Sequence, residues 1–227
     1  DKPELVLDIG CANGDTVKQV GDDFLYLAYD GVRAVKRTVQ DKLQSGQSQP
    51  LSWVLKEEFD LINWSFIANA DAIYFQDKYI LSLPTGSSTT NNQLWVYYPA
   101  LNAWSIISGQ NIAKFATVKF NNEQRLYGLD AVTGRLYRMF FGTSDNGTAI
   151  VYQEEGRAED FGKPLQFKTG GEYKISVVGN SATLTPTADI GEGYVALTGD
   201  PLTLADGGLD FNFDFPFNFS TIKGDGV

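Results

Sequence analysis

Hydrophobic positions in this chain mostly alternate with polar ones or form short runs. The clearest runs cover residues 24–29, 78–83, 94–98, 104–107, 115–120, 125–129 and 136–140. Runs of this length, rich in β-branched and aromatic side chains and bounded by Gly, Pro, Asn or Asp, are typical of β-strands. The pattern predicts a fold built mainly from short strands.

Tight turns are predicted between these runs. Asp30-Gly31 favours a hairpin that returns through residues 32–35, and Asn121-Asn122 favours another. Residues 130–134 form a further turn before the strand at 136–140. Most neighbouring strands should therefore pair in antiparallel fashion.

A helical spacing of hydrophobic residues occurs over residues 53–62. Its hydrophobic positions are Trp53, Leu55, Phe59 and Ile62. Ser52 precedes them and is a suitable N-cap residue. We expect a short helix here.

The hairpins repeat along residues 1–150. The strand pair at 94–107 has the same layout as the pair at 126–138, and preceding strands near Lys78 and Phe115 complete a four-stranded meander each time. Repeated four-stranded units are typical of β-propeller blades. We predict an all-β fold with a partial β-propeller of four-stranded antiparallel blades; a plain β-sandwich is the alternative.

The number of blades is a difficulty for this prediction. Closing a ring takes about 250 or more residues at about 40–45 residues a blade, and residues 10–140 hold about three blades. The ring would be incomplete, completed by another chain, or cut. Because the chain begins with Asp1 rather than Met, we expect a processed or fragmentary chain.

Residues 151–227 are predicted to form a second β module. A charged link at 154–160 precedes a predicted strand pair, 173–178 with 182–185, and a further strand at 194–197. This module should be sandwich-like or should add a strand to a neighbouring sheet.

The candidate interface is an alternating strand near the end of this module. Its hydrophobic face consists of Phe211, Phe213, Phe215, Phe217 and Phe219. Each Phe can bury about 150–250 Å², so covering the row is worth on the order of 10 kcal/mol. The cover is either the domain's own core or a neighbouring subunit. Pro216 cannot donate to a ladder, which favours an edge strand and hence the subunit.

Composition limits the partners. The net charge of −10 argues against tight binding to DNA phosphates or to an anionic membrane, while it permits passive contact with DNA in a channel. No apolar run approaches the roughly 18–20 residues of a membrane span, and no signal peptide is recognisable. The single Cys11 allows no internal disulfide, which fits a reducing cytosol.

Candidate chemistry is sparse. The chain has no His, which removes Ser-His-Asp and Cys-His catalysis and nearly all catalytic zinc sites. Adjacent carboxylates occur at Asp22-Asp23, Glu57-Glu58, Glu154-Glu155 and Glu159-Asp160. Neighbours on a strand point to opposite faces, so we interpret these pairs as solvated surface. Asp210-x-Asn212-x-Asp214 lacks the Gly and distal Glu of a calcium loop. We expect no catalytic residue, no cofactor and no metal.

Two further patterns bear on fold and binding. Residues 143–150 partly match the Asp-box turn of sialidase-type propellers, with Ile150 in place of the aromatic residue. The four tryptophans are expected in blade cores, with sugar stacking as the alternative. They are Trp53, Trp64, Trp95 and Trp104.

Several segments carry a family resemblance. The segments are residues 21–33, 49–52, 79–84, 91–92, 94–98, 103–105, 126–130, 134–138 and 161–163. They resemble propeller-bearing virion proteins of bacteriophages, namely the packaged-DNA stabilisation and tail-nozzle proteins of short-tailed phages. The resemblance covers roughly residues 10–180 and includes no catalytic motif. It implies a structural, non-enzymatic virion protein of the tail or head–tail connector, assembled in the host cytoplasm into a ring with copies of itself and other virion proteins.

Two other functions stay open. A glycan- or receptor-binding propeller for host recognition would use exposed Trp and Tyr as stacking platforms. A carboxylate glycosidase ranks last, because no pair of acidic residues is placed by a motif.

Overall fold

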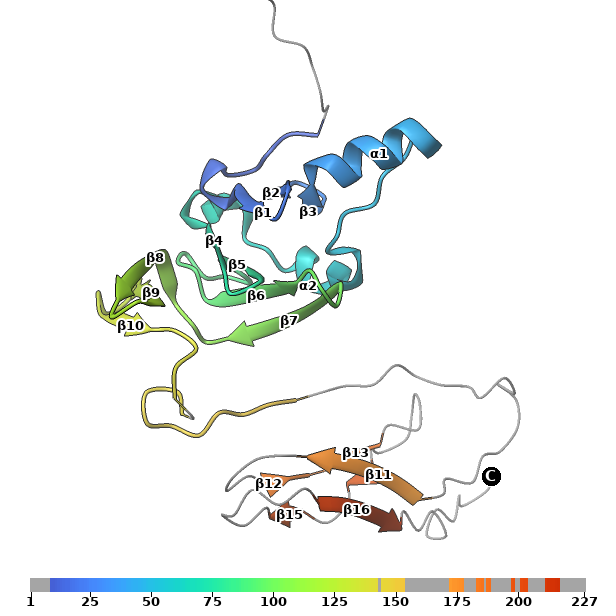
Figure 1. Cartoon of the computed structure of the whole chain (residues 1–227), viewed down its shortest axis with the longest axis vertical. Helices are drawn as coiled ribbons and strands as arrows, with labels where there is room; N and C mark the ends of the chain where they lie inside the picture. Colours follow the sequence, from blue (N-terminus) through green and yellow to red (C-terminus); the bar gives the residue numbers. More distant parts are fainter. Residues whose placement is uncertain are drawn as a thin grey trace, which may run out of the picture. The chain divides into compact units, whose positions relative to one another are not determined.

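The computed structural model describes residues 9–142 and 144–153, together with strand segments at 172–177, 183–185, 187–188, 197–198, 201–203 and 211–216. The chain divides into two compact units, Asp1–Val151 and Tyr152–Val227. The described residues are mainly β, in antiparallel sheets with few helices (Figure 1). This agrees with the predicted all-β fold class.

The first unit contains three meander sheets. The first sheet comprises β1 (Lys18–Val20), β2 (Asp23–Ala28) and β3 (Gly31–Ala34). The middle sheet comprises β4 (Asp71–Phe75), β5 (Lys78–Leu83), β6 (Gln93–Tyr98) and β7 (Ala103–Ser108). The third sheet comprises β8 (Ile112–Phe120), β9 (Glu123–Asp130) and β10 (Leu136–Arg138). All their strands pair antiparallel with their neighbours in sequence.

The short helix predicted at 53–62 is present. It consists of the 3-10 turn η2 (Trp53–Leu55) followed by α2 (Lys56–Asp60). The expected cap is wrong, because Ser52 Oγ accepts the N–H of Val32 at 2.8 Å instead. Two other 3-10 segments are η1 (Gly14–Thr16) and η3 (Trp64–Asn69).

Helix α1 (Val35–Ser45) was not predicted. The returning strand expected at 32–35 ends at Ala34, and Asp23 Oδ1 accepts the N–H of Lys36 at 2.9 Å in the first turn of the helix. Thr38 is the buried residue of α1, so the helix has no broad hydrophobic stripe on its buried side. None of the helices in the described part of the chain is long and apolar enough to cross a membrane.

The middle sheet is covered on both faces. Tyr79, Leu81 and Trp95 pack into a core shared with the first sheet, which includes Leu27 and Val32. The intervening residues point the other way, into a second core with the third sheet. That core is formed by Phe75, Ile80, Val96 and Leu126, with Phe115 and Met139 packed against it. The three sheets therefore form a layered stack, in the order of the sequence.

The third sheet differs in part from the prediction. It has three strands rather than four, and β10 ends at Arg138, short of the predicted 136–140. The first sheet also has three strands, and only the middle sheet is a complete four-stranded meander. The described residues form no closed propeller.

The second unit contains three two-stranded sheets. They pair β11 (Glu172–Val177) with β16 (Phe211–Pro216), β12 (Thr183–Leu184) with β15 (Leu202–Thr203), and β13 (Thr187–Ala188) with β14 (Leu197–Thr198). The predicted hairpin between 173–178 and 182–185 is therefore wrong. A turn-forming sequence favours local pairing, but β16 offers β11 a ladder of six residue pairs, which the two-residue β12 cannot match.

Candidate interaction surface

The predicted phenylalanine strand lies partly within the described residues. Phe211, Phe213 and Phe215 belong to β16, where they are paired with Val177, Ile175 and Tyr173 of β11. Phe217 and Phe219 lie outside the described residues. Pro216 is the last residue of β16, which accords with its inability to extend a ladder. Among the described strands, β16 pairs along one edge only.

A second candidate region is the polar junction between the three sheets. Asp71, at the start of β4, is buried, and its Oδ2 accepts the N–H of Phe115 from β8 at 2.8 Å. Lys114 Nζ lies 3.5 Å from Asp71 Oδ1 and also pairs with Asp15 of η1. The hydrogen bond from Lys114 lowers the pKa of Asp15 below its ordinary value. These carboxylates are engaged in holding strands together.

The same junction continues into the core through Tyr79 and Thr16. The hydroxyl of Tyr79 donates to the carbonyl of Thr16 at 2.8 Å, and Thr16 Oγ1 accepts the N–H of Leu27 at 3.1 Å. Both side chains are buried. Burial raises the pKa of Tyr79 far above its ordinary value, so this phenol stays neutral. The junction is structural, and it fixes η1 between the first and middle sheets.

The outer face of the third sheet is an exposed sheet surface. The strand register places Lys114, Leu129 and Leu136 in one cross-strand row, and Ala116, Tyr127 and Arg138 in the next. Val118 with Arg125 and Phe120 with Glu123 continue this face toward the β8–β9 turn. We call this surface, from Lys114 to Phe120 and across to Arg138, the outer face.

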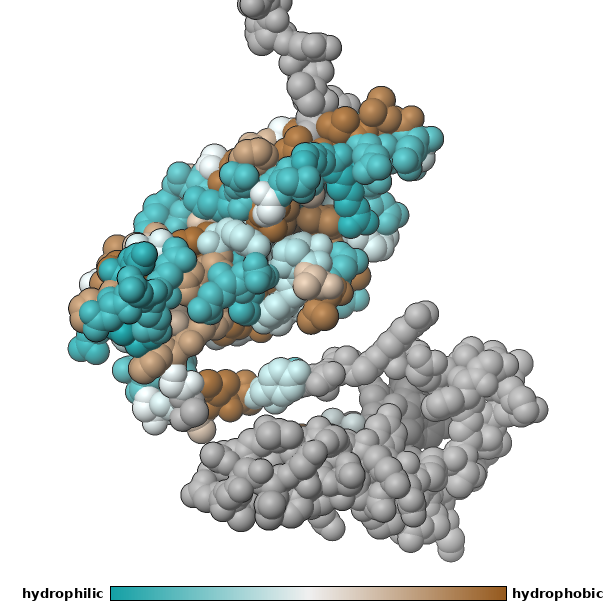
Figure 2. All heavy atoms as spheres, in the orientation of Figure 1, coloured by the Kyte–Doolittle hydropathy of each residue, from teal (hydrophilic) through white to brown (hydrophobic). Residues whose placement is uncertain are grey.

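Hydrophobic side chains on the outer face are open to solvent. The exposed fractions are 48% for Val118, 53% for Phe120, 40% for Leu129 and 62% for Leu136. Figure 2 shows hydrophobic residues at the surface over β8–β10, among hydrophilic ones, and again over α1. Exposed apolar patches on a sheet favour a partner that covers them.

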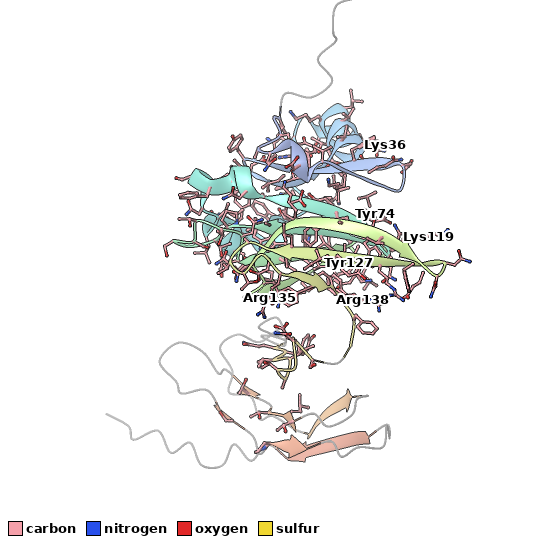
Figure 3. The ribbon with its side chains drawn as sticks, turned by 90° about the vertical axis from the view of Figure 1, so that its left-hand side faces the viewer. Lys36, Tyr74, Lys119, Tyr127, Arg135 and Arg138 are labelled. Atoms are coloured by element: carbon pink, nitrogen blue, oxygen red, sulfur yellow. The ribbon has the colours of Figure 1, made fainter. Side chains whose placement is uncertain are left out.

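The outer face also carries positive charge. Glu123 accepts hydrogen bonds from Arg125 and Arg138, at 2.8 and 2.7 Å, and the first of these is the main cause of its lowered pKa. The Arg125 guanidinium lies over the Phe120 ring at 4.7 Å, and that of Arg138 over Phe141 at 3.7 Å. Figure 3 shows this side of the unit, with Tyr127 and Arg138 on the sheet and Lys119 projecting beyond its end.

Three of the adjacent carboxylates in the described residues, Asp22, Asp23 and Glu58, have polar partners. Asp22 pairs with Lys36, Asp23 accepts the Lys36 N–H, and Glu58 accepts from Gln93 at 3.4 Å. The pairs at 154–155 and 159–160 lie outside the described residues. Within the described residues, no group of three or more Cys, Asp or Glu side chains could hold a metal ion.

The tryptophans divide between core and surface. Trp95 is fully buried, and Trp104 packs edge-on against it at 6.4 Å while donating to the Leu51 carbonyl. Trp64 is half-buried and stacks on Tyr29 at 5.3 Å. Trp53 is 53% exposed. Core packing thus accounts for Trp95 and Trp104, while Trp53 and Tyr29 are largely exposed.

The Asp-box-like segment forms a turn. Asp145 and Thr148 exchange backbone hydrogen bonds of 2.8 Å, and Asn146 and Gly147 between them adopt positive φ. Gln110, before β8, donates to Asp145 Oδ2 at 2.9 Å. Thr143 lies outside the described residues. The predicted turn is confirmed.

No protein-family model matches this chain, and no curated protein matches it significantly. The candidate surface therefore stands on its geometry. Sequence reasoning placed a strand at 115–120 but missed its exposure. Residues 115–120 are hydrophobic on both faces, with Phe115 on one and Val118 and Phe120 on the other. This pattern is typical of a strand covered from two sides, so it does not by itself indicate the exposure.

Proposed function

We propose that this chain is a structural component of a phage virion, in the tail or head–tail connector, that acts by assembling into a ring rather than by catalysis. In this proposal the three stacked sheets are consecutive blades of a propeller-like ring that one chain does not close. Copies of the chain and other virion proteins complete the particle, and DNA passes an acidic wall without being held.

The two-sided burial of the middle sheet is the observation that carries the proposal. Tyr79 and Leu81 of β5 enter one core, while Ile80 between them enters the other. A sheet in a sandwich buries one face; a blade between two blades buries both. The neighbouring sheets follow in sequence order, as blades do.

The unfinished state of the stack supports assembly. The outer face of the third sheet exposes Val118, Phe120 and Leu136, which in the interior of a stack would be covered. A single copy in solution would expose this surface to water, which costs a free energy of about 25 cal/mol for each Å² of apolar area. Association offers a way to cover it.

The test is the mass of the intact chain in solution. Sedimentation velocity and light scattering over a wide concentration range should give a closed oligomer, visible as a ring by negative-stain electron microscopy. A chain that stays monomeric at every concentration contradicts the proposal.

Glycan or receptor binding is the second candidate, favoured by one observation. Trp53 and Tyr29 expose large parts of their rings, and Tyr29 stacks on Trp64. Aromatic rings of this kind can stack on sugars. A glycan array should then give binders that Trp53→Ala weakens, and an array with no binder removes this candidate.

A further inference from the structure

We infer that the outer face of the third sheet is the docking surface for a second copy of this chain, which contacts it through an acidic surface elsewhere on that copy. This inference rests on the proposed assembly and names where it takes place. It also predicts a head-to-tail contact, since the two copies use different surfaces.

Continuity with the existing layers is the first argument. The third sheet already packs its inner face, through Leu126 and Phe115, against the middle sheet. The alternate residues of the same strands point to the outer face and include the hydrophobic Val118, Leu129 and Leu136. A further β layer on this face would extend the stack by the same kind of packing that joins the first three sheets.

Charge selects the partner. Residues 112–139 contain five basic side chains, Lys114, Lys119, Arg125, Arg135 and Arg138, against the acidic Glu123 and Asp130. The whole chain has 18 basic and 28 acidic residues, so 13 basic and 26 acidic residues lie elsewhere. The third sheet is therefore a basic region on an acidic molecule, and the rest of a second copy carries twice as many acidic as basic residues.

The arrangement of the arginines fits a contact that excludes water. Glu123 holds Arg125 and Arg138, and the two guanidinium groups also lie over Phe120 and Phe141. Their planar groups are thus fixed before any partner arrives, which reduces the entropy lost on binding. Arginine guanidinium groups bind carboxylates through charge-assisted hydrogen bonds, so an acidic partner suits this face.

A self-complementary contact of two outer faces is disfavoured, because it would bring two basic surfaces together. A contact between two different surfaces repeats from copy to copy and closes into a ring when the rotation permits. The inference therefore favours a ring over a twofold dimer.

The experiment uses the full chain with the double substitution Val118→Asp and Leu136→Asp. Both side chains are exposed, so the fold should persist, as circular dichroism and the thermal midpoint will report. Two carboxylates on the outer face should repel an acidic partner and shift the assembly midpoint to at least tenfold higher concentration in sedimentation velocity. Leu101→Asp, in the β6–β7 turn and 74% exposed, is the matched control and should assemble like wild type.

Salt and hydrogen exchange supply independent readouts. Raising the ionic strength should weaken assembly of the wild type, because the attraction is screened. Amides of residues 112–139 should become more protected as protein concentration rises. Protection that does not depend on concentration would mean that the chain covers this face itself, and it would overturn the inference.

The outcomes separate this inference from the proposed function. If the wild type assembles and the double variant assembles equally well, the docking surface is wrong while the proposed function survives. A monomeric wild type overturns both. Binding of a labelled single-stranded oligonucleotide that the double variant loses, without self-assembly, would assign the face to nucleic acid and overturn the inference.

Discussion

Asp71 and Phe115 join the middle and third sheets through one hydrogen bond, in which the buried Asp71 carboxylate accepts the Phe115 N–H at 2.8 Å. Asp71 is the first residue of β4, and Phe115 is the fourth residue of β8. The bond connects two strands that belong to different sheets and lie 44 residues apart in the sequence. It therefore fixes how one layer is placed on the next.

Asp71→Ala should destabilise the first unit. The substitution leaves the Phe115 N–H without its acceptor, and an unsatisfied buried donor costs about 1–3 kcal/mol. Urea unfolding followed by tryptophan fluorescence measures the loss. Asp15→Ala removes an exposed partner of the same Lys114 and should cost clearly less. Equal losses in the two variants would contradict the role assigned to Asp71.

Tyr79→Phe should lower the free energy of unfolding by about 0.5–1.5 kcal/mol, the usual net value of one hydrogen bond. The lost bond is the one that the buried hydroxyl donates to the Thr16 carbonyl, so η1 should loosen. Tyr74→Phe is the control, because its hydroxyl bonds to Asp77 at an exposed position. If Tyr79→Phe is as stable as Tyr74→Phe, the hydrogen bond does not hold η1.

Gly31→Ala should be the more damaging of two glycine substitutions. Gly31 has φ of +142°, and a Cβ there would lie 2.5 Å from Pro50 Cβ. Backbone strain and the clash together should cost about 2–4 kcal/mol. Gly86, with φ of +62° and open space around it, should lose about 1–2 kcal/mol as Gly86→Ala. Thermal unfolding of both variants tests the order.

The turn after β9 should contribute stability that depends on pH. The Asp130 carboxylate accepts the N–H groups of Thr133 and Val132, and the Thr133 bond is the main cause of its lowered pKa. A lowered pKa in the folded state stabilises the protein fully above the unfolded value, near 3.8, and this contribution is lost as the pH falls through the lower folded value. The stability difference between wild type and Asp130→Asn should therefore shrink below about pH 4. A difference that is constant down to pH 2 would contradict this.

The strands between 78 and 129 were predictable because local signals agree there. The predicted strand at 78–83 is β5, and the turns at Asn121 and Asn122 have the positive φ that asparagine tolerates. The alternation of hydrophobic and polar residues, the turn residues and the β-branched side chains all favour antiparallel strands in this region. Hairpin register then follows from the turns.

The missed features depend on contacts distant in sequence. Helix α1 buries Thr38 and is started by Asp23, 13 residues before Lys36, so the run after Ala34 gives no helical pattern of its own. The pairing of β11 with β16 joins segments separated by more than 30 residues. The exposure of Val118 also could not be inferred, because a strand that is hydrophobic on both faces reads the same whether its second cover is present or absent.

The double cover of the middle sheet has a consequence for how the molecule opens. Amides of β5 and β6 are shielded by a layer on either side, whereas the outer face of the third sheet is exposed. Local opening should therefore begin at the third sheet, and β5 and β6 should exchange their amide hydrogens last, close to the rate set by global unfolding. The middle sheet should therefore be the last part of this unit to unfold on heating or in denaturant.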